Sequence, residues 1–391
     1  MTDEVFIATA RRTPIGSFQG ALSALTAPQL GAVAAQAALA DSGIAADEID
    51  ETILGCVLMA GIGQAPGRQA ALAAGIPQQV PATTINKMCG SGLKAMMLAA
   101  DQIRAGSAKA ILAGGIESMT NAPYLLPKAR GGYRMGHGEI LDHMFYDGLQ
   151  NPYDGKMMGY FADATARKYG FTREQQDAFA TESVRRALAA VHGKAFEREI
   201  AAVTVKDRKG ERLVAQDETP FTCDVAKIPN LKPAFNKDGT VPAASSSSIS
   251  DGAAAAIVVS GAFAQSRNLQ PLARIVGYTS HAHAPEWFTT APVGALQSLL
   301  AKTGWRADQV DLYEINEAFA CVAMAAIHDL ELDPAKVNVN GGACALGHPI
   351  GATGARIVTT LVHALKQRGL KRGIAALCIG GGEAVAMAVE V

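Results

Sequence analysis

The chain has 391 residues, of which 49% are apolar and 18% are charged, and its formal net charge is −1. This balance is typical of a globular protein, and the length allows a large core and more than one domain. The near-neutral charge gives no broad basic surface for nucleic acid. No apolar run reaches the roughly 20 residues that a membrane helix needs. We therefore expect no nucleic-acid partner and no membrane segment.

Six cysteines are spread along the chain without a C-x-x-C pair. This spacing disfavours both a disulfide framework and a zinc site, so we expect no metal. Residues 5–8 resemble a strand, and the segment before them lacks the basic and apolar regions of a signal peptide. Reduced thiols and the missing signal together predict a cytoplasmic protein.

The spacing of apolar residues predicts helices and strands in chain order. A helix is expected over 93–103, where apolar residues recur at helical spacing before Gly106. Continuous apolar runs at 110–113 and 255–259 suit strands that are covered on both faces. A last helix is predicted over 357–365. We expect both helical stripes to pack into the core.

The chain contains a diverged internal repeat, in which strand, loop, helix, strand, paired glycines and glutamate follow in the same order. Residues 111–117 resemble residues 377–383, and residues 49–54 resemble residues 310–315. Such self-similarity indicates duplication of one α/β unit. We predict an α/β fold of two similar halves, each with a mixed, mostly parallel sheet between helices, in αβαβα layers.

A region of different character separates the two halves. It includes a polar helix from about Thr172, with a capping-box pattern to Gln175, and it ends in a run of serines. The serine run is either a flexible linker or an ordered turn, and its place before a buried strand favours the turn. We predict an N-terminal half over 1–117 with 249–270, a loop or lid insert over 118–248, and a C-terminal half over 271–391.

Cys89 follows a strand-like segment at 82–85 and directly precedes the first predicted helix. A thiol at a helix N-terminus lies near free backbone N–H groups and the positive end of the helix dipole, which favour the thiolate. Gly90 and Gly92 would let other atoms approach closely. On these grounds alone, a catalytic and a structural cysteine both remain open.

His348 lies in the glycine-rich segment 341–354. A lone histidine is more often a satisfied loop residue, but this density of glycines suits a backbone that bends tightly around a ligand. A histidine close to a cysteine can take its proton and create a nucleophilic thiolate.

Cys378 ends a predicted buried strand, and Gly380 and its neighbours could present backbone N–H groups to an oxyanion. Taken alone, Cys378 would be a core cysteine. Asn316 follows another predicted strand and is either a helix cap or a polar group in a crevice. Ligands of open α/β sheets bind beyond the carboxyl ends of strands. One crevice between the halves could therefore hold Cys89, His348, Asn316 and Cys378.

Other catalytic motifs are missing from the sequence. It has no G-x-x-x-x-G-K-[ST] phosphate loop, no G-x-S-x-G elbow and no H-E-x-x-H pair. His281 and His283 lack an evident third metal ligand, so we interpret them as surface histidines.

Four ordered blocks of the sequence resemble the signature blocks of thiolases. They are residues 86–92, 316–320, 341–349 and 378–382, and residues 11–16 also resemble the start of that family. The resemblance covers essentially the whole chain. It implies an acyltransferase that makes or breaks a carbon–carbon bond next to a coenzyme A thioester.

The resemblance also implies a role for each candidate residue. Cys89 would carry the acyl group in a ping-pong reaction, and His348 would activate its thiol. A water held by Asn316 would bind the thioester oxygen of the incoming acyl-CoA together with His348. Cys378 would remove or return the α-proton, and the backbone N–H groups of Cys89 and Gly380 would form a second oxyanion hole.

Coenzyme A contacts and assembly are implied in the same way. No cofactor would be bound permanently, because coenzyme A thioesters are the substrates. Residues 124–142 resemble the tetramerisation loop of the family, so we expect a homotetramer built as a dimer of dimers. By position, the contacts with coenzyme A would come from Met157, Met158, Phe235, Ala243, Ser247, Ala318 and Phe319.

Two departures from the family pattern bear on the substrate. Many short-chain biosynthetic members have a histidine where this chain has Met157, and a Gly-Asn-Ala-Ser-Gly-type run where it has residues 244–248. Methionine is apolar and adaptable, so it could admit a longer or branched acyl chain. The first expectation is the reversible reaction of two acetyl-CoA to acetoacetyl-CoA and coenzyme A. The alternative is a degradative 3-ketoacyl-CoA thiolase.

Two further alternatives are disfavoured by residues that are present. A ketoacyl synthase of the same fold would have a second histidine in place of Cys378. A non-catalytic binding or scaffold member would be expected to lack Cys89, His348 or Cys378, and the chain has all three.

Overall fold

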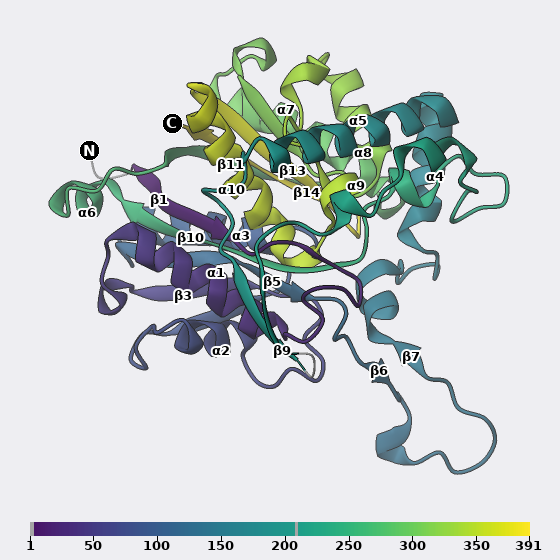
Figure 1. The fold of residues 1–391 in the computed structure, drawn as a ribbon, viewed down its shortest axis with the longest axis horizontal. Coiled ribbons are helices and arrows are strands. Elements are labelled where there is room, and N and C mark those ends of the chain that lie inside the picture. Colours follow the sequence, from purple (N-terminus) through teal and green to yellow (C-terminus); the bar gives the residue numbers. More distant parts are fainter. Residues whose placement is uncertain (1–3, 208–209) are drawn as a thin grey trace.

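A mixed sheet of ten strands runs through the computed structural model, which describes residues 4–207 and 210–391. Its order is β12-β13-β14-β11-β1-β10-β5-β3-β4, with the short β2 (Gly16–Ser17) beside β10 (Figure 1). The long strands are β1 (Val5–Arg12), β3 (Glu51–Gly55), β4 (Ala82–Ile85), β5 (Ala110–Ser118), β10 (Ser250–Ser260), β11 (Ala273–Ala282), β12 (Leu312–Ile315), β13 (Arg372–Ile379) and β14 (Glu383–Glu390).

Each predicted half supplies one part of this sheet. The two parts join where β1 pairs with β11, at Phe6–Arg274 and Ile7–Ala273. Parallel pairs are restricted to β3 with β4 and β5, and to β12 with β13. The α/β class is confirmed, but the expected predominance of parallel pairs holds only for these outer strands. One reason is the short turn between β13 and β14, since so few residues can only form an antiparallel connection.

Helices form layers on and between the two parts of the sheet, which confirms the predicted layering. Helices α1 and α2 pack on the N-terminal strands, and α7 packs on β11 and β14. Helices α3 and α10 lie together between the two parts, and both contact strands. The helices are α1 (Ala27–Ser42), α2 (Pro66–Ala73), α3 (Ser91–Arg104), α4 (Met158–Tyr169), α5 (Arg173–His192), α6 (Gly261–Ser266), α7 (Ala291–Thr303), α8 (Ala320–Asp329), α9 (Ala343–Leu346) and α10 (Ile350–Arg368).

The two central helices approach each other closely because glycine lies at their crossing. A Cβ added to Gly354 of α10 would lie 2.4 Å from the backbone nitrogen of Leu93 in α3. Any side chain there would push α10 away from α3. Because Cys89 lies two residues before α3 and His348 two residues before α10, this contact brings the two candidate residues close together.

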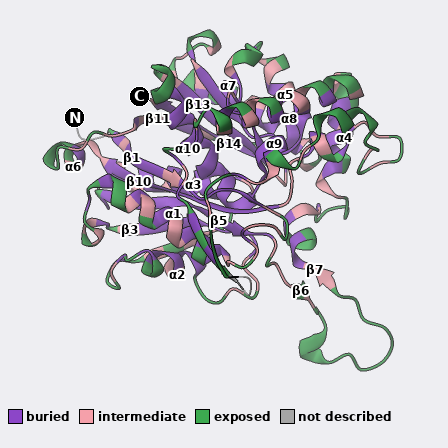
Figure 2. Ribbon diagram, in the orientation of Figure 1, coloured by how far each residue is buried: buried purple, intermediate pink, exposed green. Residues whose placement is uncertain are grey.

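Helices α4 and α5 of the predicted insert pack against α8 and α9 of the C-terminal part, but one segment projects away from the rest (Figure 1). The hairpin of β6 (Tyr124–Leu125) and β7 (Leu141–Asp142) extends into solvent (Figure 1), and its loop, residues 126–140, is exposed throughout (Figure 2). A second hairpin joins β8 (Val203–Asp207) to β9 (Gly210–Val214). The three domain boundaries remain predictions.

Two local expectations in the insert are confirmed. The hydroxyl of Thr172 accepts the N–H of Gln175, and the side chain of Gln175 accepts the N–H of Thr172, which completes the capping box of α5. The serine run is an ordered turn, because Ser245 is fully buried and the N–H of Ser247 donates to the carbonyl of Ala318 at 3.0 Å. Among the described helices, none is long and apolar enough to cross a membrane.

Candidate active site

Cys89 lies in a tight turn between β4 and α3. Met88 has a φ of +48°, which is strained for a residue with a side chain. The hydroxyl of Ser91 accepts the N–H of Lys87 at 2.8 Å and donates to the carbonyl of Met88 at 2.7 Å. Gly90 packs closely here, because an added Cβ would lie 2.5 Å from the end of the Ile379 side chain in β13. The turn therefore brings Cys89 against the end of β13.

The Cys89 thiol is neutral at rest. Burial raises its pKa to about 11, although hydrogen bonding by the backbone N–H groups of Gly380 and of Cys89 itself lowers it. The sequence led us to expect that the helix N-terminus would favour the thiolate. This expectation is wrong for the net pKa of Cys89, which is raised. The N–H groups do act in that direction, but the loss of solvent outweighs them. A base is therefore needed to form the nucleophile.

We expect alkylation of Cys89 by iodoacetamide to be slow at neutral pH and to rise steadily beyond pH 9, the ordinary value for a thiol. The reason is that only the thiolate reacts, and a raised pKa leaves little of it at neutral pH. Mass spectrometry of the peptide that contains Cys89 would follow the reaction against pH. A rate that levels off below pH 9 would contradict the raised pKa.

His348 precedes α10, and its two ring nitrogens have different surroundings. The hydroxyl of Thr353 donates to the carbonyl of Pro349 at 2.9 Å and lies 2.7 Å from Nδ1 of His348. Because that hydroxyl proton is already used, the hydroxyl oxygen accepts a hydrogen bond from the Nδ1–H of His348. Nε2 then carries the free lone pair, and it is buried without a hydrogen-bond partner among the described residues.

The imidazole of His348 is neutral as well. Burial, assisted by the positive charge of Arg356, lowers its pKa to about 3. The site therefore pairs a neutral thiol with a neutral imidazole whose free nitrogen can take a proton. Sequence reasoning did not find Thr353, although it lies in the glycine-rich segment five residues after the histidine, where a helical turn could return its hydroxyl to the ring.

Cys378 and Asn316 lie at the ends of neighbouring strands of the C-terminal part. Cys378 is fully buried near the end of β13, and burial, with smaller contributions from Cys89 and Cys321, raises its pKa well above the usual range. Asn316 follows β12 and is 1% exposed. Neither its side-chain oxygen nor its side-chain nitrogen has a partner among the described residues. Buried amides are normally satisfied, so this one has capacity for a water or a ligand.

A cavity of about 210 Å³ brings most of the predicted residues together. Cys89, His348 and Gly380 line it, whereas Cys378 packs in an adjoining cluster with residues of its wall. Asn316 and Ala243 do not line it; Ala243 begins the turn Ala243–Ser245 and is exposed. The predicted coenzyme A contacts that do line it are Met157, Met158, Phe235, Ser247, Ala318 and Phe319.

Several other residues complete the wall of this cavity, and sequence reasoning missed them. They come from the insert, from the turn Pro285–Thr290 before α7, and from the start of α10, so no local motif links them. Most of them are apolar, which suits a slot for an alkyl or acyl chain. They are Met119, Phe145, Gly148, Leu149, Gly159, Ser246, Ser248, Ile249, Phe288 and Ile350.

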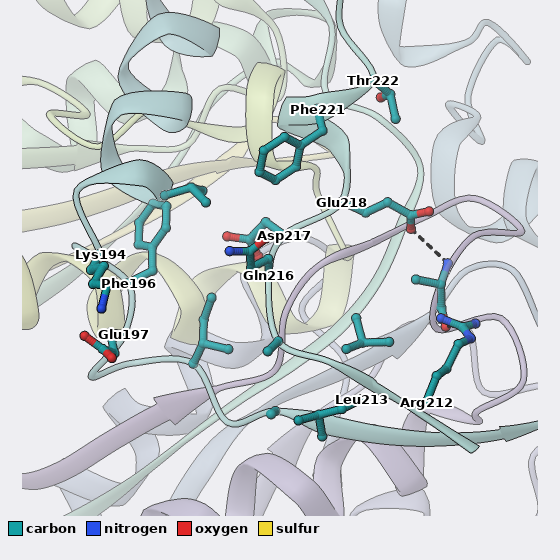
Figure 3. A pocket seen from close by; sticks show the side chains of 16 residues that line it. Lys194, Phe196, Glu197, Arg212, Leu213, Gln216, Asp217, Glu218, Phe221 and Thr222 are labelled. Atoms are coloured by element: carbon teal, nitrogen blue, oxygen red, sulfur yellow. Dashed lines mark hydrogen bonds between the residues drawn. The ribbon is translucent and has the colours of Figure 1, made fainter.

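A larger cavity of about 730 Å³ lies elsewhere, between α5 and the β9 strand (Figure 3). It contains none of the predicted site residues. Two of its carboxylates already have partners, because Asp217 pairs with Arg12 at 2.7 Å and Glu218 accepts the N–H groups of Ser17 and Ala21 at 2.9 Å. These groups hold the insert on the N-terminal half rather than forming a second reactive site.

His281 and His283 do not form a metal site with a third ligand. Their rings are in edge contact at 5.3 Å, and Nε2 of His283 lies 2.8 Å from the carbonyl of Trp287. Within residues 4–207 and 210–391, no group of three histidine, cysteine or acidic side chains is arranged to hold a metal ion.

Two protein-family domains together match the chain over nearly its whole length. Residues 5–262 match the N-terminal domain of thiolases, and residues 269–391 match the thiolase C-terminal domain. A fold with two α/β parts, with a cysteine and a histidine at the helices between them, is the thiolase fold. The chain therefore belongs to the thiolase family.

Individual relatives are similar over the full chain. An acetyl-CoA acetyltransferase of Pseudomonas aeruginosa is 50% identical over 98% of both chains, and one of Cupriavidus necator is 49% identical over 100% of both. The crystal structure of the Bacillus anthracis acetyl-CoA acetyltransferase has a TM-score of 0.97 at 42% identity, covering 100% of this chain and 99% of that one. A thiolase from Ascaris suum, solved in complex with coenzyme A, has a TM-score of 0.94 at 43% identity and covers 99% of each chain.

Proposed function

We propose that this thiolase is an acetyl-CoA acetyltransferase, which interconverts two acetyl-CoA with acetoacetyl-CoA and coenzyme A. One observation carries the proposal most directly. The thiol of Cys89 and the unpartnered Nε2 of His348 line the same small, mostly apolar cavity. The identity of about 50% to two acetyl-CoA acetyltransferases over almost the full length supports the choice of substrate.

In the thiolytic direction, Nε2 of His348 takes the proton of the Cys89 thiol. The thiolate attacks the 3-keto carbon of acetoacetyl-CoA, and the bond between carbons 2 and 3 breaks. Cys378 donates its proton to the enolate that leaves as acetyl-CoA. The raised pKa of Cys378 suits this step, because it keeps the proton on the sulfur until carbon accepts it.

The acetyl group then remains on Cys89, and free coenzyme A enters as the second substrate. The Cys378 thiolate takes the proton of the coenzyme A thiol, whose sulfur attacks the acetyl carbon. Cys89 leaves as a thiolate and recovers its proton from His348, so both cysteines return to their starting states. The condensation runs through the same steps in reverse, with Cys378 removing the α-proton.

Two sets of hydrogen-bond donors would stabilise the oxyanions. The N–H groups of Cys89 and Gly380, which both act on the Cys89 sulfur, are suited to the oxygen of the acetyl group carried there. The unsatisfied amide of Asn316 can hold a water that, together with His348, binds the thioester oxygen of the other substrate.

The test is an assay with purified protein, acetoacetyl-CoA and free coenzyme A, followed by loss of the 3-ketoacyl absorbance. We expect turnover and release of two acetyl-CoA per cleavage. If the protein, with Cys89 reduced and intact, cleaves no 3-ketoacyl-CoA of any chain length, the proposal is wrong.

A degradative thiolase with a longer or branched acyl substrate is the second candidate, and Met157 favours it. Met157 lines the cavity beside Met158 and Phe288, so an acyl chain bound there would face flexible or apolar side chains. We expect Met157→His to lower kcat/KM for a six-carbon 3-ketoacyl-CoA about tenfold more than for acetoacetyl-CoA, because methylene groups lose an apolar contact. A chain-length series on both proteins would measure this, and equal losses would contradict a role of Met157 in specificity.

A homotetramer in the cytoplasm, without a permanently bound cofactor, completes the proposal. Apolar side chains on the β6–β7 hairpin are exposed in the single chain, with Met135 97% exposed and Ile140 65% exposed. Exposed apolar groups of this kind mark contact surfaces. Replacing Tyr133, Met135 and Ile140 with serine should convert tetramers to dimers, as seen by light scattering. A tetramer that survives this change would show that the hairpin does not hold it together.

A further inference from the structure

Glu117 is a buried carboxylate that the proposed reaction does not use. It lies near the end of β5 and is 0% exposed. No lysine or arginine within residues 4–207 and 210–391 forms an ion pair with it, so backbone groups and a thiol make up its surroundings. A carboxylate without a cation at this depth is costly unless several donors satisfy it.

The donors to Glu117 come from both halves of the fold. In the N-terminal half, its oxygens accept the N–H groups of Val57 and Leu58, both at 3.1 Å, and lie 3.8 Å from the Cys56 sulfur. In the C-terminal half, the N–H of Gly351 in the first turn of α10 donates at 2.9 Å. The free N–H groups and the dipole of a helix N-terminus stabilise an anion placed there.

The two segments that donate to Glu117, residues 56–58 and the first turn of α10, are both next to the cavity. Gly351 lies three residues after His348, and the neighbouring Ile350 lines the cavity wall. Val57 and Leu58 form a buried cluster with Ile350, on which Met88 and Cys89 pack. The carboxylate therefore lies behind the part of the cavity wall that Ile350 forms, next to the cluster on which Cys89 packs.

We propose that Glu117 is a positioning residue for acyl transfer, because its carboxylate ties residues 56–58 of one half to the first turn of α10 in the other. The tie holds Cys89 and His348 at the spacing that proton transfer needs. The proposal rests on the proposed function, since it assumes that these two residues react together. A small displacement of reacting groups can reduce turnover by about 10²-fold.

The charge of Glu117 gives this role a measurable signature. Its negative charge contributes to the raised pKa of the Cys89 thiol, after the larger effect of burial. Burial also raises the pKa of Glu117 itself to about 7, against the lowering effect of its backbone donors. Among the described residues, the titratable groups that interact with this carboxylate are the thiols of Cys56 and Cys89.

The decisive variant is Glu117→Gln, which keeps the shape but removes the charge and turns one acceptor into a donor that faces N–H groups. We expect kcat for acetoacetyl-CoA cleavage to fall about 10- to 100-fold, with KM within about twofold of the original value. The midpoint of Cys89 alkylation by iodoacetamide should move to lower pH, so the thiol becomes more reactive while the enzyme becomes slower. A loosened fold would also expose Cys89 and lower its pKa, so thermal unfolding of the variant and the charge-keeping Glu117→Asp variant separate the two causes.

Asp251→Asn is the matched control. Asp251 is also fully buried, on the adjacent strand β10, but its oxygen accepts from Thr120 at 2.9 Å and from Ser118 at 3.3 Å. This variant should leave the alkylation midpoint where it is. An equal shift in both variants would overturn the proposal, and so would Glu117→Gln with an unchanged kcat or an unchanged midpoint.

If the Glu117→Gln variant does not fold, Glu117→Asp tests whether Glu117 positions the reacting groups. It keeps the charge but shortens the reach, so kcat should fall while the alkylation midpoint stays. An unchanged kcat in this variant overturns the proposal. A wild-type protein that cleaves no 3-ketoacyl-CoA would instead remove the proposed function. The alkylation midpoints would still show whether Glu117 acts on the thiol.

Discussion

Replacing Cys89 with alanine is expected to abolish cleavage of acetoacetyl-CoA, with a loss in kcat of more than about 10⁴-fold. The other thiols are not placed to substitute for it. Cys56, Cys321 and Cys344 are buried and do not line the cavity, and Cys223 is half-buried in the insert. Cys378 is also fully buried and does not line the cavity, and burial raises its pKa well above the usual range, so it stays protonated. Without the nucleophile, the acyl group has no covalent carrier, and the ping-pong sequence cannot begin.

Intact mass spectrometry after incubation with acetyl-CoA would test the same prediction independently of turnover. The wild-type chain should gain one acetyl group, and the alanine variant should gain none. Cys223→Ala is the control, because this half-buried thiol lines no part of the cavity, and we expect it to acetylate and turn over like the wild type. Acetylation of the Cys89→Ala variant would show that another residue is the acyl carrier.

Replacing Cys378 with alanine is expected to separate the two halves of the reaction. Acylation of Cys89 by acetyl-CoA should survive within about tenfold, because His348 can still take the thiol proton and coenzyme A can leave as a thiolate without a proton from Cys378. Carbon–carbon cleavage and condensation should fall by about 10²- to 10⁴-fold, the usual contribution of a general acid or base. The raised pKa of Cys378 keeps it protonated at rest, and alanine has no proton to give to the leaving enolate.

Rapid quench with acetyl-CoA, followed by mass spectrometry of the Cys89 peptide, would measure acylation alone. The loss of 3-ketoacyl absorbance would measure cleavage in the same preparation. Because Cys378 is fully buried and the variant loses its sulfur atom, which leaves a small cavity, the stability of the variant should be checked by thermal unfolding. A variant that condenses at the wild-type rate would remove Cys378 from the mechanism. Equal losses in both steps would mean that it only supports the position of Cys89.

The tertiary structure changed the chemical interpretation of Cys89 more than its position. Local sequence placed the thiol correctly at the start of a helix, and the helix terminus does provide N–H groups. Whether the thiolate forms at rest depends on how deeply the sulfur is buried, and residues far apart in the chain decide that. The result is a neutral thiol that depends on His348.

The sequence by itself determined the family, the α/β class and the internal duplication. Periodicity located α3, α10, β5 and β10, because each is long enough for its spacing to be unambiguous. Motifs also named the residues Cys89, His348, Asn316 and Cys378, whose roles remain to be tested by the experiments above.

Only the tertiary structure decided what surrounds those residues. The antiparallel pairs of β1, β10, β11 and β14 are long-range contacts, and a strand's own pattern does not reveal its neighbour's direction. The tautomer of His348 follows from the placement of the Thr353 hydroxyl, and the part that Glu117 plays follows from donors in two halves of the chain. These features depend on hydrogen bonds whose geometry is precise and whose partners can be hundreds of residues apart in the chain. A local sequence pattern does not encode such contacts.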